Sequence, residues 1–203
     1  MKKFVISIIM CLIVASGASA KFRWGPTVGA NFSSYSWNQD LFATSLRTGF
    51  NAGVMCEVMI PGIGFGVNFG LKYSNRGGIC NFGEPQVWKD DNVGNQNLRL
   101  HTIQLPINLR FKYTRLNGIE NIVAPFAFAG PQINFNVANS DCPILSRQGV
   151  SLGLEVGGGV ELFKRFQISA GYVWDVTRDL KTYKLDDFTA SLHGAIVDFT
   201  VLF

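Results

Sequence analysis

Hydrophobic and polar residues alternate along most of this chain with a period of two. In the closing stretch "ASLHGAIVDFTVLF", every second residue counted back from Phe203 is apolar, whereas the intervening set carries Asp198. Residues two apart lie on the same face of a β-strand. The alternation predicts strands over 22–33, 47–59, 64–76, 98–113, 122–136, 149–162, 165–176 and 190–203. Helical spacing is hard to find, so the pattern predicts an all-β protein.

The links between these strands alternate between short and long. The tight "IPGI" joins the second strand to the third, and "FKR" near 163–165 joins the sixth to the seventh, while the link at 114–121 has moderate length. The links near 34–46, 77–97, 137–148 and 177–189 are longer and polar. Each strand reaches the roughly 9–11 residues that a tilted strand needs to cross a bilayer. Short turns at one end and long loops at the other indicate an eight-stranded antiparallel up-and-down transmembrane β-barrel.

The polar residues of each strand decide which of its two faces lies inside the barrel. A soluble barrel of the lipocalin type would place the bulky apolar set inward, around a ligand. Here the polar set is rich in Gly, Ser, Asn and Thr, which suits a narrow interior, and its charges balance, as burial requires. The predicted lumen charges are Arg23, Lys72, Arg76, Arg110 and Lys112 against Glu57, Glu155, Glu161, Asp175 and Asp198. The apolar set is therefore predicted to face lipid.

Aromatic residues near the strand ends support this choice. An interfacial girdle on the lipid face is predicted at Trp24, Tyr73, Tyr113, Tyr172, Trp174 and Phe203. The faces of segment 122–136 cannot be assigned, because Phe126 and Phe128 share a parity with Gln132 and Asn134. Pro106 predicts a β-bulge, and most glycines are predicted to face inward and make space for long charged side chains.

The N-terminal stretch predicts the compartment. "MKKFVISIIMCLIVASGASA" combines two lysines, a short apolar run and a small-x-small cleavage site, so residues 1–20 are predicted to be a signal peptide and residues 21–203 the mature barrel domain. Loss of Lys2 and Lys3 lowers the formal charge from +4 to +2. A nearly neutral chain without a basic block gives no reason to expect nucleic-acid binding. The predicted location is the outer membrane of a Gram-negative cell, in contact with outer-membrane lipids.

Several stretches resemble the PorT-like outer-membrane β-barrel family. "FRWGPTVGANFS" is similar to that family's "G-x-x-x-G-x-N-x-S" opening, "FGVNFGLKYSNRGG" to its "G-L-x-Y-x-x-x-G" third strand, and "IQLPINLRFKY" to its "I-P-L-x-L-K-Y" fourth strand. "APFAFAGPQINF" and "GVSLGLEVGGGVEL" complete the series. The resemblance implies an eight-stranded barrel similar to those of OmpA and OmpX, and one branch of the family is linked to protein secretion and maturation at the cell surface. The terminal Phe203 resembles the signal that such barrels present to the barrel assembly machinery.

Candidate chemistry is sparse. Cys80 and Cys142 fall in predicted outer loops, and a disulfide between them is an open alternative to two free thiols in an oxidising compartment. Ser191, His193 and His101 have lipid-face parity near the outer rim, and no acid with the right parity orients either histidine. The glycine runs precede no helix that could complete a phosphate site, and the aspartates of 175–187 lack the spacing of a calcium loop. We expect no catalytic residue, metal or cofactor.

The predicted function lies in the outer loops. A lumen filled by paired charges would close the barrel to solutes, which leaves a structural or surface-interaction role with an unknown protein partner at these loops. The longest loop, 77–97, contains Trp88 and Phe82 among charged residues. An accessory role in protein secretion is the first alternative, and a lipid-modifying enzyme is the second.

Overall fold

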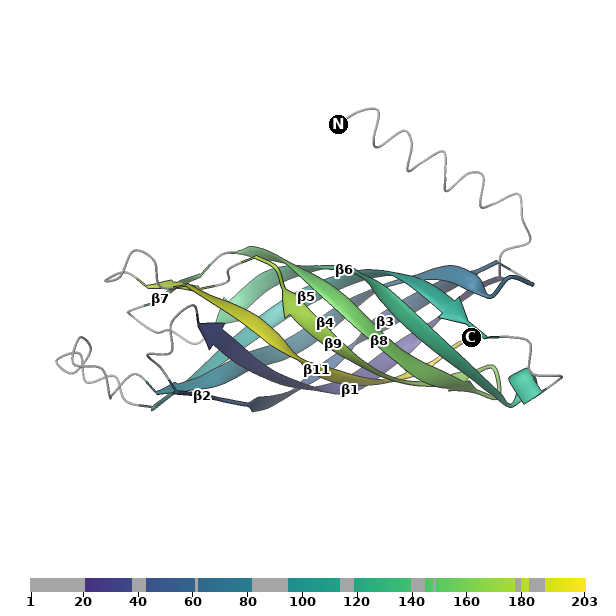
Figure 1. Cartoon of the computed structure of the whole chain (residues 1–203), viewed down its shortest axis with the longest axis horizontal. Helices are drawn as coiled ribbons and strands as arrows, with labels where there is room; N and C mark the ends of the chain where they lie inside the picture. Colours follow the sequence, from purple (N-terminus) through teal and green to yellow (C-terminus); the bar gives the residue numbers. More distant parts are fainter. Residues whose placement is uncertain are drawn as a thin grey trace, which may run out of the picture.

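The protein folds as a single barrel of long strands, seen in a computed structural model (Figure 1). The structure describes residues 21–37, 43–60, 62–81, 95–113, 119–139, 145–147, 149–177, 180–182 and 189–203. The barrel strands are β1 (Lys21–Trp37), β3 (Arg47–Met59), β4 (Phe65–Asn81), β5 (Asn95–Lys112), β6 (Val123–Asn139), β8 (Val150–Leu162), β9 (Phe166–Asp175) and β11 (Thr189–Val201). The predicted signal peptide, residues 1–20, lies outside the described residues.

The sheet closes on itself. Each barrel strand pairs antiparallel with the next barrel strand along the chain, and β1 pairs with β11 from Thr27–Thr200 to Trp37–Ala190. Three short strands extend the sheet at the end that carries the long loops: β2 (Ala43–Ser45), β7 (Leu145–Arg147) and β10 (Leu180–Thr182). The predicted fold class, an eight-stranded antiparallel up-and-down barrel, is confirmed. Closure matters because it leaves none of the long strands with an unpaired edge.

The short turns gather at the opposite end. Residues 60–64 connect β3 to β4 and residues 163–165 connect β8 to β9, while the link from β5 to β6 includes a single 3-10 turn, η2 (Ile119–Asn121). The C-terminus lies at this same end (Figure 1). Short turns are periplasmic in outer-membrane barrels, so this end is the periplasmic one. No helix among the described residues is long and apolar enough to cross a membrane.

An apolar belt surrounds the barrel. On β5 the outward residues from Ile103 to Tyr113 are apolar or aromatic, and on β1 the same holds from Phe22 to Phe32. Leu109, in the middle of the belt, is 71% exposed, because its side chain points outward, toward the lipid. Above the belt the outward residues turn polar, with Ser34 and Ser36 on β1 and Arg99 and His101 on β5. Several strands thus continue past the belt toward the outside.

One local expectation needs correction. The sequence predicted a bulge at Pro106, but β4 and β5 keep one register across it: Phe69 pairs with Ile107 and Lys72 with Gln104, with an interruption between. A proline removes a ladder hydrogen bond without requiring an extra residue. The register shift of β5 falls instead between His101 and Thr102, on the side facing β6.

Candidate functional site

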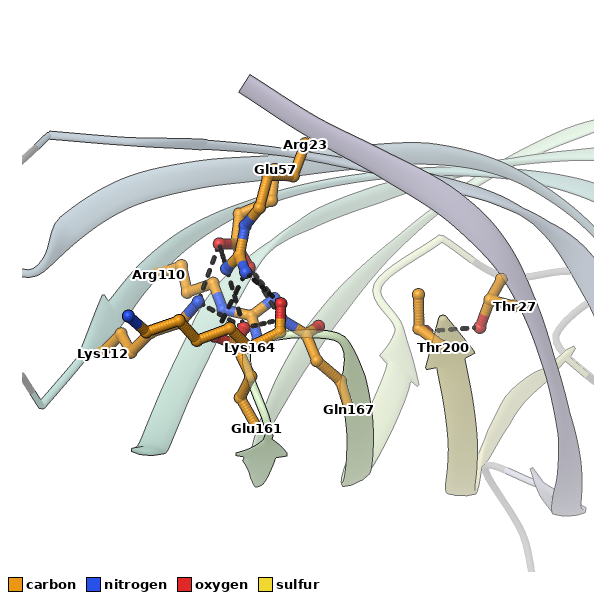
Figure 2. Close-up of polar contacts among 9 residues, drawn as sticks. All are labelled: Arg23, Thr27, Glu57, Arg110, Lys112, Glu161, Lys164, Gln167 and Thr200. Atoms are coloured by element: carbon orange, nitrogen blue, oxygen red, sulfur yellow. Dashed lines mark hydrogen bonds and ion pairs between the residues drawn. The ribbon is translucent and has the colours of Figure 1, made fainter. Parts of the chain in front are cut away.

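The periplasmic half of the interior holds a cluster of five charged side chains, which we call the inner tier (Figure 2). The guanidinium of Arg23 lies 2.5 Å from a carboxylate oxygen of Glu57 and 2.7 Å from one of Glu161. The ammonium of Lys112 bridges the same two carboxylates at 2.8 and 2.6 Å. Arg110 reaches the other oxygen of Glu57 at 3.2 Å. Three cations therefore share two carboxylates.

Two further tiers lie toward the outside. In the middle tier the Lys72 ammonium lies 3.0 Å from Asp198 and 3.9 Å from Glu155, and the Asn108 side chain donates a hydrogen bond of 2.8 Å to Glu155. Here one cation faces two carboxylates, which offsets the excess positive charge of the inner tier. The middle-tier lysine is 2% exposed, so water does not screen this pairing.

The outer tier is a single pair. Arg76 contacts Asp175 at 3.0 Å, and Asn134 donates a hydrogen bond of 3.1 Å to the same carboxylate. The structure thus places all ten sequence-predicted lumen charges in the interior and brings them into three groups. Because a buried charge without a partner is costly, the equal numbers of the two signs are a condition for packing them all inside.

The faces of β6, which the sequence left unassigned, are clear in the structure. Phe126 and Phe128 point inward together with Gln132 and Asn134, and all four are buried. The guanidinium carbon of Arg110 sits 3.6 Å from the centre of the Phe126 ring, a cation–π arrangement. The inward residues of β6 therefore keep one alternation throughout the strand. The sequence pattern did not reveal it because the two phenylalanines are apolar residues on the otherwise polar face.

Glycines opposite these rings correct a second expectation. A Cβ on Gly157 would lie 2.5 Å from the Phe128 ring, and a Cβ on Gly159 would lie 2.7 Å from the Phe126 ring. Gly157 and Gly159 of "VGGGVEL" therefore make space for two aromatic rings and not for long charged side chains, whereas Gly29 and Gly153 do face the Asp198 and Asp175 carboxylates. Small and large residues face each other across the lumen, which lets a narrow barrel fill its interior.

The outer mouth of the interior is apolar, which sequence reasoning missed. Buried apolar residues gather above the outer tier on β1, β4, β5 and β11, and we call them the outer plug: Tyr35, Cys80, Leu98, Leu100, Ala190 and Leu192. The alternation along each strand could have identified them, since Leu98 and Leu100 lie on the same inward face of β5 as Thr102. Only Tyr35 and Cys80 lie beyond the predicted strands, which ended at residues 33 and 76.

Little space remains between the tiers. A cavity of about 20 Å³ is bounded by Glu57, Lys72, Arg110, Phe128 and Asp198 together with their neighbours. A single water molecule occupies at least roughly 10–15 Å³ measured in this way. The interior at this level therefore has room for about one water.

The six predicted girdle residues lie on the outer wall at two levels. Trp24, Tyr113 and Phe203 are at the periplasmic end, where the Trp24 and Phe203 rings are 6.1 Å apart. Tyr73, Tyr172 and Trp174 are at the outer end of the belt. Two levels of aromatic side chains are the arrangement that a barrel presents to the two membrane interfaces.

The histidines weighed for catalysis lie at the outer aromatic level. The Tyr73 hydroxyl and His101 Nδ1 are 2.5 Å apart, and His193 stacks on Tyr172. Ser191 and His193 line a surface hollow of about 340 Å³ with Asp175, but that carboxylate is held by Arg76. Among the described side chains no group of three His, Cys, Asp or Glu residues is placed to hold a metal ion.

Cys80 does not lie in a loop, as the sequence predicted, but near the outer end of β4, and its side chain is fully buried. β4 extends to Asn81, beyond the predicted strand, because the alternation with inward small residues continues through Gly78. Cys142 lies outside the described residues. The disulfide between them stays a prediction, which mass spectrometry of the unreduced protein tests.

Comparisons with known proteins agree with this architecture. A family model described as "outer membrane protein beta-barrel domain" matches residues 15–177. The crystal structure of the outer membrane protein OprG from Pseudomonas aeruginosa is similar, with 10% identity over 92% of this chain and 97% of that chain and a TM-score of 0.56. Comparison with curated protein sequences gives no match.

Two further solved structures have lower TM-scores. Ail, the attachment invasion locus protein of Yersinia pestis, has 15% identity over 90% of this chain and 99% of that chain, with a TM-score of 0.49. The outer membrane enzyme PagL has 7% identity over 87% and 98%, with a TM-score of 0.47. At such identities the likeness concerns the fold alone. The matched family model, together with the closed barrel and its apolar belt, shows that this chain belongs to the outer membrane β-barrel domain family and is a protein of the Gram-negative outer membrane.

Proposed function

We propose that the protein is a barrel closed to solutes, which acts as a structural or surface-interaction protein through its extracellular loops. The observation that supports this proposal is the burial of charged and apolar side chains across the lumen above the periplasmic mouth. The three tiers of ion pairs occupy successive levels of the interior, and the outer plug covers the outer mouth with buried leucine and tyrosine side chains. A solute would have to displace both the ion pairs and the outer plug to pass. Interactions with other molecules would therefore take place at the outer surface.

The outer ends of the strands favour a role at the surface. β4 and β5 have 17 and 18 residues, whereas a transmembrane strand needs roughly 9–11. The surplus carries the polar outward residues above the belt, and it forms a rigid base for the loops. Residues 82–94, the central part of the predicted contact loop, lie outside the described residues, so their role rests on their sequence.

Conductance tests the closed lumen. Purified protein in planar bilayers is expected to give no resolved single-channel steps. The matched variant replaces Tyr35, Leu98 and Leu192 of the outer plug with alanine, which leaves the ion-pair tiers unchanged. Large steps from the natural protein would refute the proposal, because they require a continuous aqueous path.

Crosslinking in whole cells tests the surface role. A photoreactive amino acid at Asn97, next to the long loop, is expected to capture a specific protein, and replacing residues 82–94 with a Gly-Ser segment of equal length is expected to abolish the capture. The same photoreactive group at Leu109 serves as the control, since that side chain faces lipid. Equal capture from both positions would contradict a loop-mediated interaction.

Deletion of the gene separates the alternatives. The resemblance of several stretches to PorT-like motifs supports the secretion alternative, and on that alternative a survey of surface proteins would show a defect in export. A lipid-modifying enzyme would alter lipid A, so unchanged lipid A in the deletion strain supports the non-enzymatic role that we propose.

A further inference from the structure

The periplasmic mouth of the barrel carries a hollow of about 510 Å³. Its wall comes from separate parts of the chain: Lys21 at the start of β1, Met59 and Ile60 at the end of β3, Ala124 on β6, and Lys164 in the turn between β8 and β9. Its floor is the inner tier, whose Arg23, Lys112 and Glu161 also line it. The hollow therefore opens to the periplasm and ends at the ion pairs.

Positive charge dominates this hollow. Lys21 and Lys164 lie on its rim, and neither has an ion-pair partner among the side chains that the structure describes. Beneath them the inner tier already holds three cations for two carboxylates. The excess charge points to an anionic occupant, because a concave site lined by one sign of charge concentrates ligands of the other sign.

Exposed apolar residues stand near the same mouth, and one of them, Ile60, lines the hollow. Ile60, Ile63, Ile122 and Phe163 stand in or beside the three periplasmic connections, and each is between 40% and 62% exposed. Exposed apolar residues that ring a polar hollow mark an interaction site more often than a solvated surface. The occupant that fits this rim carries apolar groups beside its negative charge.

The turn that borders the hollow is strained. Phe163 and Lys164 have φ angles of 51° and 59°, the left-handed region that bulky side chains rarely adopt. A two-residue hairpin of this shape normally uses Asn-Gly. In this turn the Lys164 carbonyl accepts a hydrogen bond of 2.8 Å from the Arg23 guanidinium (Figure 2). The turn also carries a phenylalanine and a lysine side chain that Asn-Gly would not supply. Strained turns persist where the conformation serves a function.

We propose that this periplasmic mouth binds an acidic and apolar peptide segment of a periplasmic protein, whose carboxylates meet Lys21 and Lys164 while its apolar side chains contact Met59, Ile60 and the exposed apolar residues of the connections. A peptide fits better than a lipid headgroup, because the hollow opens at the end of the barrel and includes lumen residues, whereas headgroups surround the outer wall. This inference does not depend on the role proposed for the outer loops.

The experiment uses the folded mature chain in nanodiscs of phosphatidylcholine, which carry no net charge. The probe is a fluorescein-labelled peptide, Leu-Asp-Phe-Glu-Leu-Asp with an amidated end, followed by fluorescence anisotropy. We expect saturable binding that weakens with salt. The double variant Lys21→Gln with Lys164→Gln is expected to bind roughly tenfold more weakly, since each exposed ion pair contributes about a factor of three. The matched control Arg99→Gln removes an exposed cation at the opposite end and is expected to leave binding unchanged.

A second variant separates binding from folding. Replacing Phe163 with Asn and Lys164 with Gly supplies the residues that the turn geometry favours, so we expect a higher melting temperature together with weaker peptide binding. The proposal is overturned if the peptide does not bind, if a peptide with Asn and Gln in place of the acids binds equally well, or if Arg99→Gln weakens binding as much as the lysine variant. It is also overturned if adding phosphatidylglycerol to the nanodiscs displaces the peptide from the natural chain, since lipid headgroups would then be the occupant.

Discussion

Lys72 is the residue whose replacement tests the ion-pair tiers most directly. It is the cation of the middle tier, where it faces Asp198 at 3.0 Å and Glu155 at 3.9 Å. Methionine has a similar length and no charge, so Lys72→Met keeps most of the packing and leaves two buried carboxylates without their cation. Asn108 still donates a hydrogen bond to Glu155, and the Asp198 carboxylate loses its only ion pair among the described side chains.

The cost follows from burial. Lys72 and Asp198 are 2% and 7% exposed, so water cannot replace the lost interaction. Removing one partner of such a pair destabilises a protein by about 3–5 kcal/mol, which lowers the folding equilibrium constant by roughly 100- to 4,000-fold. Asp198→Asn on the Lys72→Met background removes one of the two buried negative charges that have lost their cation, and we expect it to restore about 2 kcal/mol.

Urea unfolding in phosphatidylcholine vesicles, followed by tryptophan fluorescence, measures these differences. Arg99→Met provides the matched control, because it removes an exposed cation and is expected to change the free energy of unfolding by less than about 0.5 kcal/mol. A loss below about 1 kcal/mol for Lys72→Met, or a double variant no more stable than the single one, would refute the reasoning. Either result would mean that water reaches the middle tier.

Three other measurements follow from the same packing. A Cβ at position 157 would lie 2.5 Å from both the Phe128 ring and the Ala170 carbonyl oxygen, so we expect Gly157→Val to lose about 1–3 kcal/mol in the unfolding assay, of which Phe128→Ala restores only the part due to the ring; an unaffected single variant would contradict the close contact. The thiol of Phe69→Cys is expected to be modified by lipid-attached thiol-reactive probes, whereas the thiol of Asn68→Cys is expected to be protected from them. The reverse pattern would mean that the apolar face lies inside the barrel. Deleting Phe203 is expected to reduce the amount of folded barrel in the outer membrane, measured as the heat-modifiable band in membrane fractions, while an unchanged amount would argue against its role in assembly.

The alternation of the sequence determined much of this fold. A period of two fixes which residues share a face, and the length of each link fixes which end of the barrel it occupies, so both could be predicted without a structure. The lumen charges followed for the same reason, because a face with equal numbers of acids and bases has to be enclosed. The strand faces were uncertain only in β6, where Phe126 and Phe128 stand among the inward residues.

Only the tertiary structure decided which inward residues meet. Lys72 and Asp198 are 126 positions apart in the chain, and their pairing depends on the register of every strand between them. The same registers divide the charges into tiers, set glycines opposite aromatic rings and gather the outer plug from four strands. The periplasmic hollow likewise joins the ends of several strands and one strained turn. Sequence periodicity specifies the face on which a residue lies, whereas its height in the barrel and its partners follow from strand stagger, which no local pattern records.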